Sequence, residues 1–111
     1  MIVKKPSIFI YTNHADKDIL KEICAGIEEE GVFYEVFVRD EADLDTLAYE
    51  AARDSMMGSG IGLKFVDTAL QMKGLPKGKN IEQYHIPSYE ECRKIGANSA
   101  RAIKKMERPT Y

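Results

Sequence analysis

The short link between two extended runs constrains the fold of this chain more than any other feature. Gly60–Lys64 and Val66–Met72 are both apolar and strand-like, and only a residue or two separates them. A parallel connection needs roughly a dozen residues, so these runs are predicted to form an antiparallel hairpin. After a Gly- and Pro-containing loop over residues 73–80, Ile81–Ile86 is expected to return antiparallel as a fifth strand.

The first half of the chain alternates strand-like and helix-like segments. Ser7–Tyr11 is a short, continuous apolar run, typical of a strand that is covered on both faces. A helix follows, with Asp16 as its cap and Gly31 as its stop, and Phe33–Val38 is the next strand. A second helix opens near Asp43 and precedes the hairpin. This β-α-β-α order predicts a parallel sheet with right-handed crossovers.

The last predicted element is the most clearly marked. Ser88–Glu91, directly after Pro87, is typical of a capping box at the start of a helix. Apolar and small residues then recur at spacings of three and four, as in an amphipathic helix. Together the segments predict a single domain over residues 1–111, with a three-layer α/β fold on a mixed five-stranded sheet.

Charge and composition argue against several classes of function. Sixteen basic and eighteen acidic side chains leave a net charge of −2, so we expect no nucleic-acid partner. No apolar run approaches the ~18 residues of a membrane-spanning helix, and the N-terminus has no apolar stretch of signal-peptide length. We therefore expect a cytoplasmic chain with no membrane partner, in which Cys24 and Cys92 form no disulfide.

Few residues of the sequence are candidates for catalysis or for phosphate binding. His14 follows the first strand, where open α/β sheets often place active sites, and His85 lies at the end of the fifth. Either could act as a base, although sequence spacing fixes no partner for them. Cys24 and Cys92 fall on apolar helix stripes, which favours small core residues over nucleophiles. Gly58–Gly62 follows a helix and enters a strand, so it predicts close backbone approach by a helix or another subunit and not a phosphate loop.

Three consecutive glutamates end the first predicted helix. Glu28, Glu29 and Glu30 stand directly before Gly31. Carboxylates in a last helical turn face the negative end of the helix dipole, where each costs ~0.3–1 kcal/mol. They are either a solvated charge run or a site that an outside cation neutralises, a divalent metal or basic side chains of a partner. Since Mg²⁺ and Ca²⁺ take about six or more oxygen ligands, another chain or water would have to complete any such site.

Three blocks of sequence, taken in order, resemble a known family. They are Ile23–Val32, Gly60–Leu63 and Ile95–Arg101. They resemble the small (β) subunit of the diol/glycerol dehydratase reactivating factor, and are also similar to the medium subunit of the cobalamin-dependent dehydratases. The resemblance spans nearly the whole chain. The length of 111 residues favours the reactivase subunit, because the dehydratase subunit has an additional N-terminal segment.

The resemblance implies a non-catalytic docking subunit whose sheet has the order 2-1-3-4-5 with strand four antiparallel. It implies a large, actin-like ATPase subunit as partner, in a heterotetramer of two large and two small chains. By exchanging subunits with an inactivated dehydratase, the factor would release damaged cobalamin. The family also places a divalent ion, Mg²⁺ or Ca²⁺, between the two kinds of subunit. The glutamate that reaches it corresponds to Glu29, with Glu28 and Glu30 as neighbouring interface candidates, and the chain would hold no cofactor alone.

Three hypotheses follow from the sequence. The first is a reactivase assembly subunit with Glu29 at an interfacial metal, and the second is a dehydratase subunit that contacts cobalamin. The third is a small α/β enzyme or phosphotransfer-type domain that uses His14 or Cys24. An isolated chain could also self-associate through the surface that a partner would cover. The sequence does not distinguish a glycerol from a propanediol system, nor does it place the system inside or outside a bacterial microcompartment.

Overall fold

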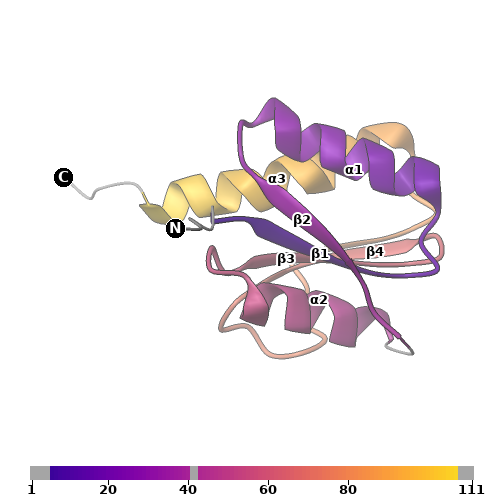
Figure 1. The fold of residues 1–111 in the computed structure, drawn as a ribbon, viewed down its shortest axis with the longest axis horizontal. Coiled ribbons are helices and arrows are strands. Elements are labelled where there is room, and N and C mark those ends of the chain that lie inside the picture. The colour runs from indigo at the N-terminus through magenta and orange to yellow at the C-terminus, as the bar shows by residue number, and fades with distance from the viewer. Residues whose placement is uncertain (1–5, 41–42, 108–111) are drawn as a thin grey trace, which may run out of the picture.

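The computed structural model describes residues 6–40 and 43–107, which form five strands and three helices (Figure 1). In chain order they are β1 (Ile8–Asn13), α1 (Lys17–Glu29), β2 (Tyr34–Val38), α2 (Leu44–Asp54), β3 (Ser59–Lys64), β4 (Asp67–Met72), β5 (Glu82–His85) and α3 (Tyr89–Glu107). Every element predicted from the sequence is present. Among the described residues, no helix combines the length and apolarity needed to cross a membrane.

The five strands form one mixed sheet in the order β2-β1-β3-β4-β5. β1 lies between β2 and β3 and is parallel to both. β4 is antiparallel to β3, with Lys64 opposite Asp67, and β5 is antiparallel to β4. The predicted α/β class, strand order and hairpin are confirmed, the hairpin because so short a link cannot carry a parallel crossover.

Helices cover both faces of the sheet and produce three layers. α1 and α3 pack side by side on one face, and α2 lies on the other (Figure 1). The larger core lies under α1 and α3 and contains aliphatic side chains such as Ile23 and Ile95. The smaller core, under α2, is formed by Tyr11, Leu47 and Ala51. Successive residues of β1 alternate between the two cores, which explains its continuous apolar sequence.

Side-chain caps fix where the helices begin. Asp16 accepts hydrogen bonds from two amides at the start of α1, and Asp43 accepts one at the start of α2. Before α3, Ser88 accepts from the Glu91 amide at 3.1 Å, while Glu91 accepts from the Ser88 amide at 3.0 Å. The chain leaves α1 through Gly31, whose φ of +74° favours a residue without a β-carbon. All the caps predicted from the sequence are confirmed.

Glycines let the helices approach the sheet and one another. A β-carbon added at Gly60 of β3 would lie 2.1 Å from a backbone nitrogen of α2. The glycines of β3 therefore admit a helix, one of the two alternatives left by the sequence. A β-carbon added at Gly96 of α3 would lie 2.2 Å from a carbonyl oxygen of α1, and Gly26 of α1 faces α3 in the same way. This mutual contact sets how closely α1 and α3 pack.

The α1–α3 contact predicts the sign of a stability change. In a helix whose surface is free, Gly→Ala stabilises the fold by ~1 kcal/mol. We expect Gly96→Ala instead to destabilise the chain by ~1–3 kcal/mol, because the new methyl group meets the α1 backbone. Urea unfolding would measure it, with the exposed Lys94→Ala on the same helix as a near-neutral control. A gain in stability for Gly96→Ala would contradict the described packing.

Candidate functional site

The glutamates predicted as an interface lie at the C-terminal end of α1. Glu28 and Glu29 are its last helical residues, Glu30 is its C-cap, and Gly31 turns the chain toward β2. We call Glu28, Glu29 and Glu30 the acidic helix end. The last turn of α1 contains no basic residue, so α1 itself offers nothing to offset the negative end of its dipole.

Basic side chains of α3 supply the cations that α1 lacks. Arg101 Nη2 and Lys104 Nζ each lie 3.2 Å from a carboxylate oxygen of Glu30, and Arg93 pairs with Glu29. The hydrogen bond from Arg101, followed by that from Lys104, lowers the pKa of the Glu30 carboxyl. The sequence left a solvated charge run and an outside cation as alternatives, and neither included these cations from the chain itself. The physical reason lies in α3, which runs alongside α1 in the same direction and brings its basic side chains to the acidic helix end.

The carboxylate of Glu28 contacts β2 instead. The Tyr34 hydroxyl donates a hydrogen bond of 2.7 Å to it. This hydrogen bond raises the pKa of Tyr34 well above its ordinary value, because the neighbouring negative charge opposes loss of the hydroxyl proton. The acidic helix end is thus joined to the start of β2 as well as to α3.

The side chains of Glu29 and Glu30 differ in how far they are exposed to solvent. The side chain of Glu30 is 19% exposed and has two cationic partners among the described residues, whereas that of Glu29 is 61% exposed and has one. That one cation, Arg93, is shared, since its Nε also lies 2.7 Å from Glu22. Exposed pairs of this kind contribute only ~0–1 kcal/mol to stability. Glu29 can therefore exchange its cation more easily than Glu30 can.

A divalent ion would need more ligands than the described part of this chain brings together. Within residues 6–40 and 43–107, no group of three or more His, Cys, Asp or Glu side chains is placed to hold a metal ion. Glu29 could give one oxygen ligand to Mg²⁺ or Ca²⁺ if the ion replaced Arg93 as its counter-charge. The described residues therefore fit a shared site to which Glu29 gives one ligand, and its other ligands would come from outside the described part of the chain.

The two histidines lie at the sheet edge formed by the carboxyl ends of β1, β3 and β5, where the sequence predicted them. His14 has a φ of +50°, and its ring stacks on Phe65 with 5.6 Å between ring centroids. His14 also lines an open depression of about 770 Å³, together with Lys64. No serine, threonine or cysteine is among the described residues around this depression, so His14 has no such nucleophile to activate there. His85 pairs through Nδ1 with the carboxylate of Asp67, opposite it on β4.

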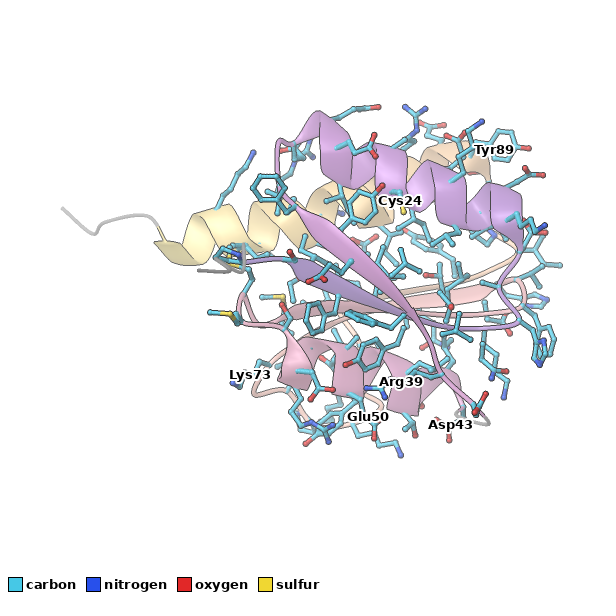
Figure 2. All side chains as sticks on the ribbon, in the orientation of Figure 1. Cys24, Arg39, Asp43, Glu50, Lys73 and Tyr89 are labelled. Atoms are coloured by element: carbon cyan, nitrogen blue, oxygen red, sulfur yellow. The ribbon has the colours of Figure 1, made fainter. Side chains whose placement is uncertain are left out.

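Both cysteines are buried free thiols, as predicted. Cys24 projects from the side of α1 that faces the sheet (Figure 2). Burial raises the pKa of Cys24 and raises that of Cys92 to about 11. A thiol shifted in this direction is protonated at neutral pH and is a weak nucleophile. Both behave as small core residues.

The sequence reasoning missed an exposed apolar surface along β2. Val36, Phe37 and Val38 are 40%, 37% and 80% exposed, and Met56 nearby is 74% exposed. Phe37 lies on the face of the sheet where α2 packs on β1, β3 and β4, whereas Val36 and Val38 lie on the opposite face, so β2 is exposed on both faces. The strand order 2-1-3-4-5 that the resemblance implies carried a signal for this, because it places the second strand at the edge of the sheet.

Comparison with known proteins identifies relatives of the whole described fold. A family described as dehydratase medium subunit matches residues 5–108. A glycerol dehydratase reactivase structure aligns at 28% identity and a TM-score of 0.85, covering 90% of this chain and 93% of that one. A chain from the structure of a diol dehydratase-reactivating factor complexed with ADP and Mg²⁺ aligns at 25% identity and a TM-score of 0.85. That alignment covers 92% of this chain and 95% of the other.

The contacts of Glu30 predict a pH dependence of stability. Arg101 and Lys104 hold the pKa of Glu30 below its ordinary value in the folded chain. The stabilisation is fully present above the unfolded pKa of about 4.3 and is lost as the pH falls through the lower folded pKa. We expect Glu30→Gln to lower the thermal midpoint at pH 7, and the gap from wild type to close toward about pH 3.

Thermal unfolding between these pH values would measure the gap. Glu90→Gln is the control, because Glu90 is exposed on α3 and has no ion-pair partner within the described residues. Its midpoint should follow that of wild type at every pH. A gap for Glu30→Gln that is the same at pH 7 and at about pH 3 would contradict the ion pairs as the source of the effect.

Proposed function

Because this chain belongs to the dehydratase medium subunit family, we propose that it is the small subunit of a reactivating factor serving a diol or glycerol dehydratase. The observation that carries the proposal is the similarity to two reactivase chains over 93% and 95% of their length. In this proposal the chain catalyses no reaction itself. It docks on a large ATPase subunit, in a heterotetramer of two large and two small chains, and works in the cytoplasm, whether or not inside a microcompartment.

The proposed task is exchange of partners. A subunit that shares its fold with dehydratase medium subunits can leave the ATPase subunit while that subunit takes hold of an inactivated dehydratase, which then releases damaged cobalamin. Exchange needs contacts that break readily. The exposed pair between Glu29 and Arg93 supports this role, since such pairs re-form with other charges at little cost.

A subunit of a cobalamin-dependent dehydratase is the second candidate, favoured by the description of the matching family. Co-purification from the native host distinguishes the two. A reactivase subunit should bring down an ATPase chain, and adding the purified complex with ATP should restore activity to an inactivated dehydratase. Cobalamin absorbance that stays with the purified complex, without ATPase activity, would favour the dehydratase subunit and contradict the proposal.

Within this proposal, Glu29 gives one ligand to the divalent ion between the subunits. We expect Glu29→Gln to weaken binding to the large subunit about tenfold in the presence of Mg²⁺, ~1.4 kcal/mol. The fold should keep its stability within ~1 kcal/mol, because the side chain is 61% exposed. Calorimetric titration of the two subunits, with Mg²⁺ and with a chelator, would measure both the affinity and its dependence on the metal.

Arg93→Gln is the matched control for this titration. It removes the same ion pair from the other side, together with the pair between Arg93 and Glu22, but leaves the Glu29 carboxylate in place. If Glu29 acts as a ligand, Arg93→Gln should keep the Mg²⁺ dependence that Glu29→Gln loses. Equal affinities for wild type and Glu29→Gln would rule out the metal role, and equal losses in both variants would assign the effect to the ion pair.

A further inference from the structure

In the described part of the chain, β2 is an edge strand whose outer side carries unpaired backbone groups. Within the described residues it pairs with β1 alone. The carbonyl of Phe33 accepts from β1 at 2.9 Å, and the Arg39 amide donates to β1 at 2.7 Å. Because successive residues of a strand direct their polar groups to opposite sides, the N–H and C=O groups of Tyr34, Val36 and Val38 point away from the sheet. They are available to another strand.

The β2 edge, residues 35–39, also lacks the usual protection of an edge strand. Natural edges carry lysines, prolines or bulges that prevent pairing with other chains. The sequence Glu-Val-Phe-Val-Arg contains neither lysine nor proline, and its three apolar side chains are 37–80% exposed. This favours pairing along the edge.

Two charged side chains of the β2 edge are incompletely paired. Glu35 has no ion-pair partner among the described residues. Arg39 lies beside α2 at the end of β2 (Figure 2), where its guanidinium is 4.1 Å from the Tyr11 ring centroid and Nη2 is 3.4 Å from Asp54. Its buried Nε has no hydrogen-bond acceptor among the described residues. Each charge can therefore accept an additional partner of opposite sign.

We propose that the β2 edge pairs antiparallel with the β2 edge of a second copy of this chain, about a two-fold axis at Phe37. The pattern of residues around Phe37 is self-complementary. Val36 and Val38 stand one residue on either side of it, and Glu35 and Arg39 stand two residues on either side. A two-fold axis at Phe37 therefore sets Val36 opposite Val38 of the second copy, and Glu35 opposite its Arg39. Every directly opposed pair is apolar with apolar or acidic with basic.

The neighbouring registers lack this match. An axis at Glu35 would place two glutamates directly opposite each other, which is destabilising. An axis at Val36 would set Glu35 against Phe37 of the second copy. An axis that passes between two residues would set a residue whose backbone N–H and C=O groups point outward opposite one whose groups point toward β1. The two strands could then form no ladder of hydrogen bonds. Charge complementarity thus selects the axis at Phe37. A second copy is the favoured occupant because the surface complements itself. This inference does not rest on the proposed reactivase function.

Single cysteines at the three candidate axes test the register. With the axis at Phe37, the two copies of residue 37 form a non-hydrogen-bonded pair with Cα atoms ~4.5 Å apart, within disulfide range. The two copies of residue 36 lie ~7–8 Å apart on a diagonal, and those of residue 35 lie ~13 Å apart along the strands. We expect Phe37→Cys to form a covalent dimer on oxidation, and Val36→Cys and Glu35→Cys to form at least about tenfold less. The native thiols are buried, so wild type should stay uncrosslinked.

Charge reversal tests the pairing without the loss of an aromatic side chain. Glu35→Lys places a lysine opposite Arg39 of the second copy, and the dimer dissociation constant should rise at least about tenfold. Glu90→Lys makes the same charge change at an exposed site on α3 and should leave it unchanged. Arg39→Glu should also weaken the dimer, whereas an equimolar mixture of Glu35→Lys and Arg39→Glu restores opposite charges in both pairs and should dimerise. Sedimentation velocity over a range of concentrations would measure all four.

A chain that remains monomeric at every concentration would overturn the proposal. So would equal cross-linking at residues 35 and 37, or a mixture of the two charge variants that stays monomeric. If the chain is monomeric and Glu35→Lys instead loses binding to a co-purified ATPase subunit, the β2 edge belongs to that partner and not to a second copy.

Discussion

The close contact of α1 with α3 is the constraint on which the rest of the structure depends. Gly26 and Gly96 face the opposing helix backbone, and no side chain fits between them. At this separation the basic residues of α3 reach the acidic helix end, which would otherwise carry its negative charges at the negative end of a helix dipole. The same contact closes the larger hydrophobic core over the sheet.

Much of the fold was predictable because its signals are local. The link between β3 and β4 is too short for a crossover, and the Ser88–Glu91 capping box fixes the start of α3. The cations of the acidic helix end were not predictable. Arg93 and Glu29 are 64 residues apart, and only the crossing of two helices brings them together. The exposed surface of β2 was missed because it depends on where the helices lie on the two faces of the sheet.

The acidic helix end and the β2 edge are neighbouring surfaces of different character. The Tyr34 hydroxyl bonds to Glu28 and so links the end of α1 to the start of β2. The acidic helix end presents carboxylates whose ion pairs can exchange, and Glu29 exchanges its cation most readily. The β2 edge presents unpaired backbone groups and apolar side chains. Both surfaces thus present groups that another chain could bind, as the proposed docking role requires.

Hydrogen–deuterium exchange with and without the proposed ATPase subunit tests docking through the acidic helix end most directly. The account predicts slower exchange of the amides of residues 28–34 in the complex, and unchanged exchange around His14 and His85. It would be contradicted by a complex that leaves residues 28–34 as accessible as in the free chain while protecting the histidine edge of the sheet.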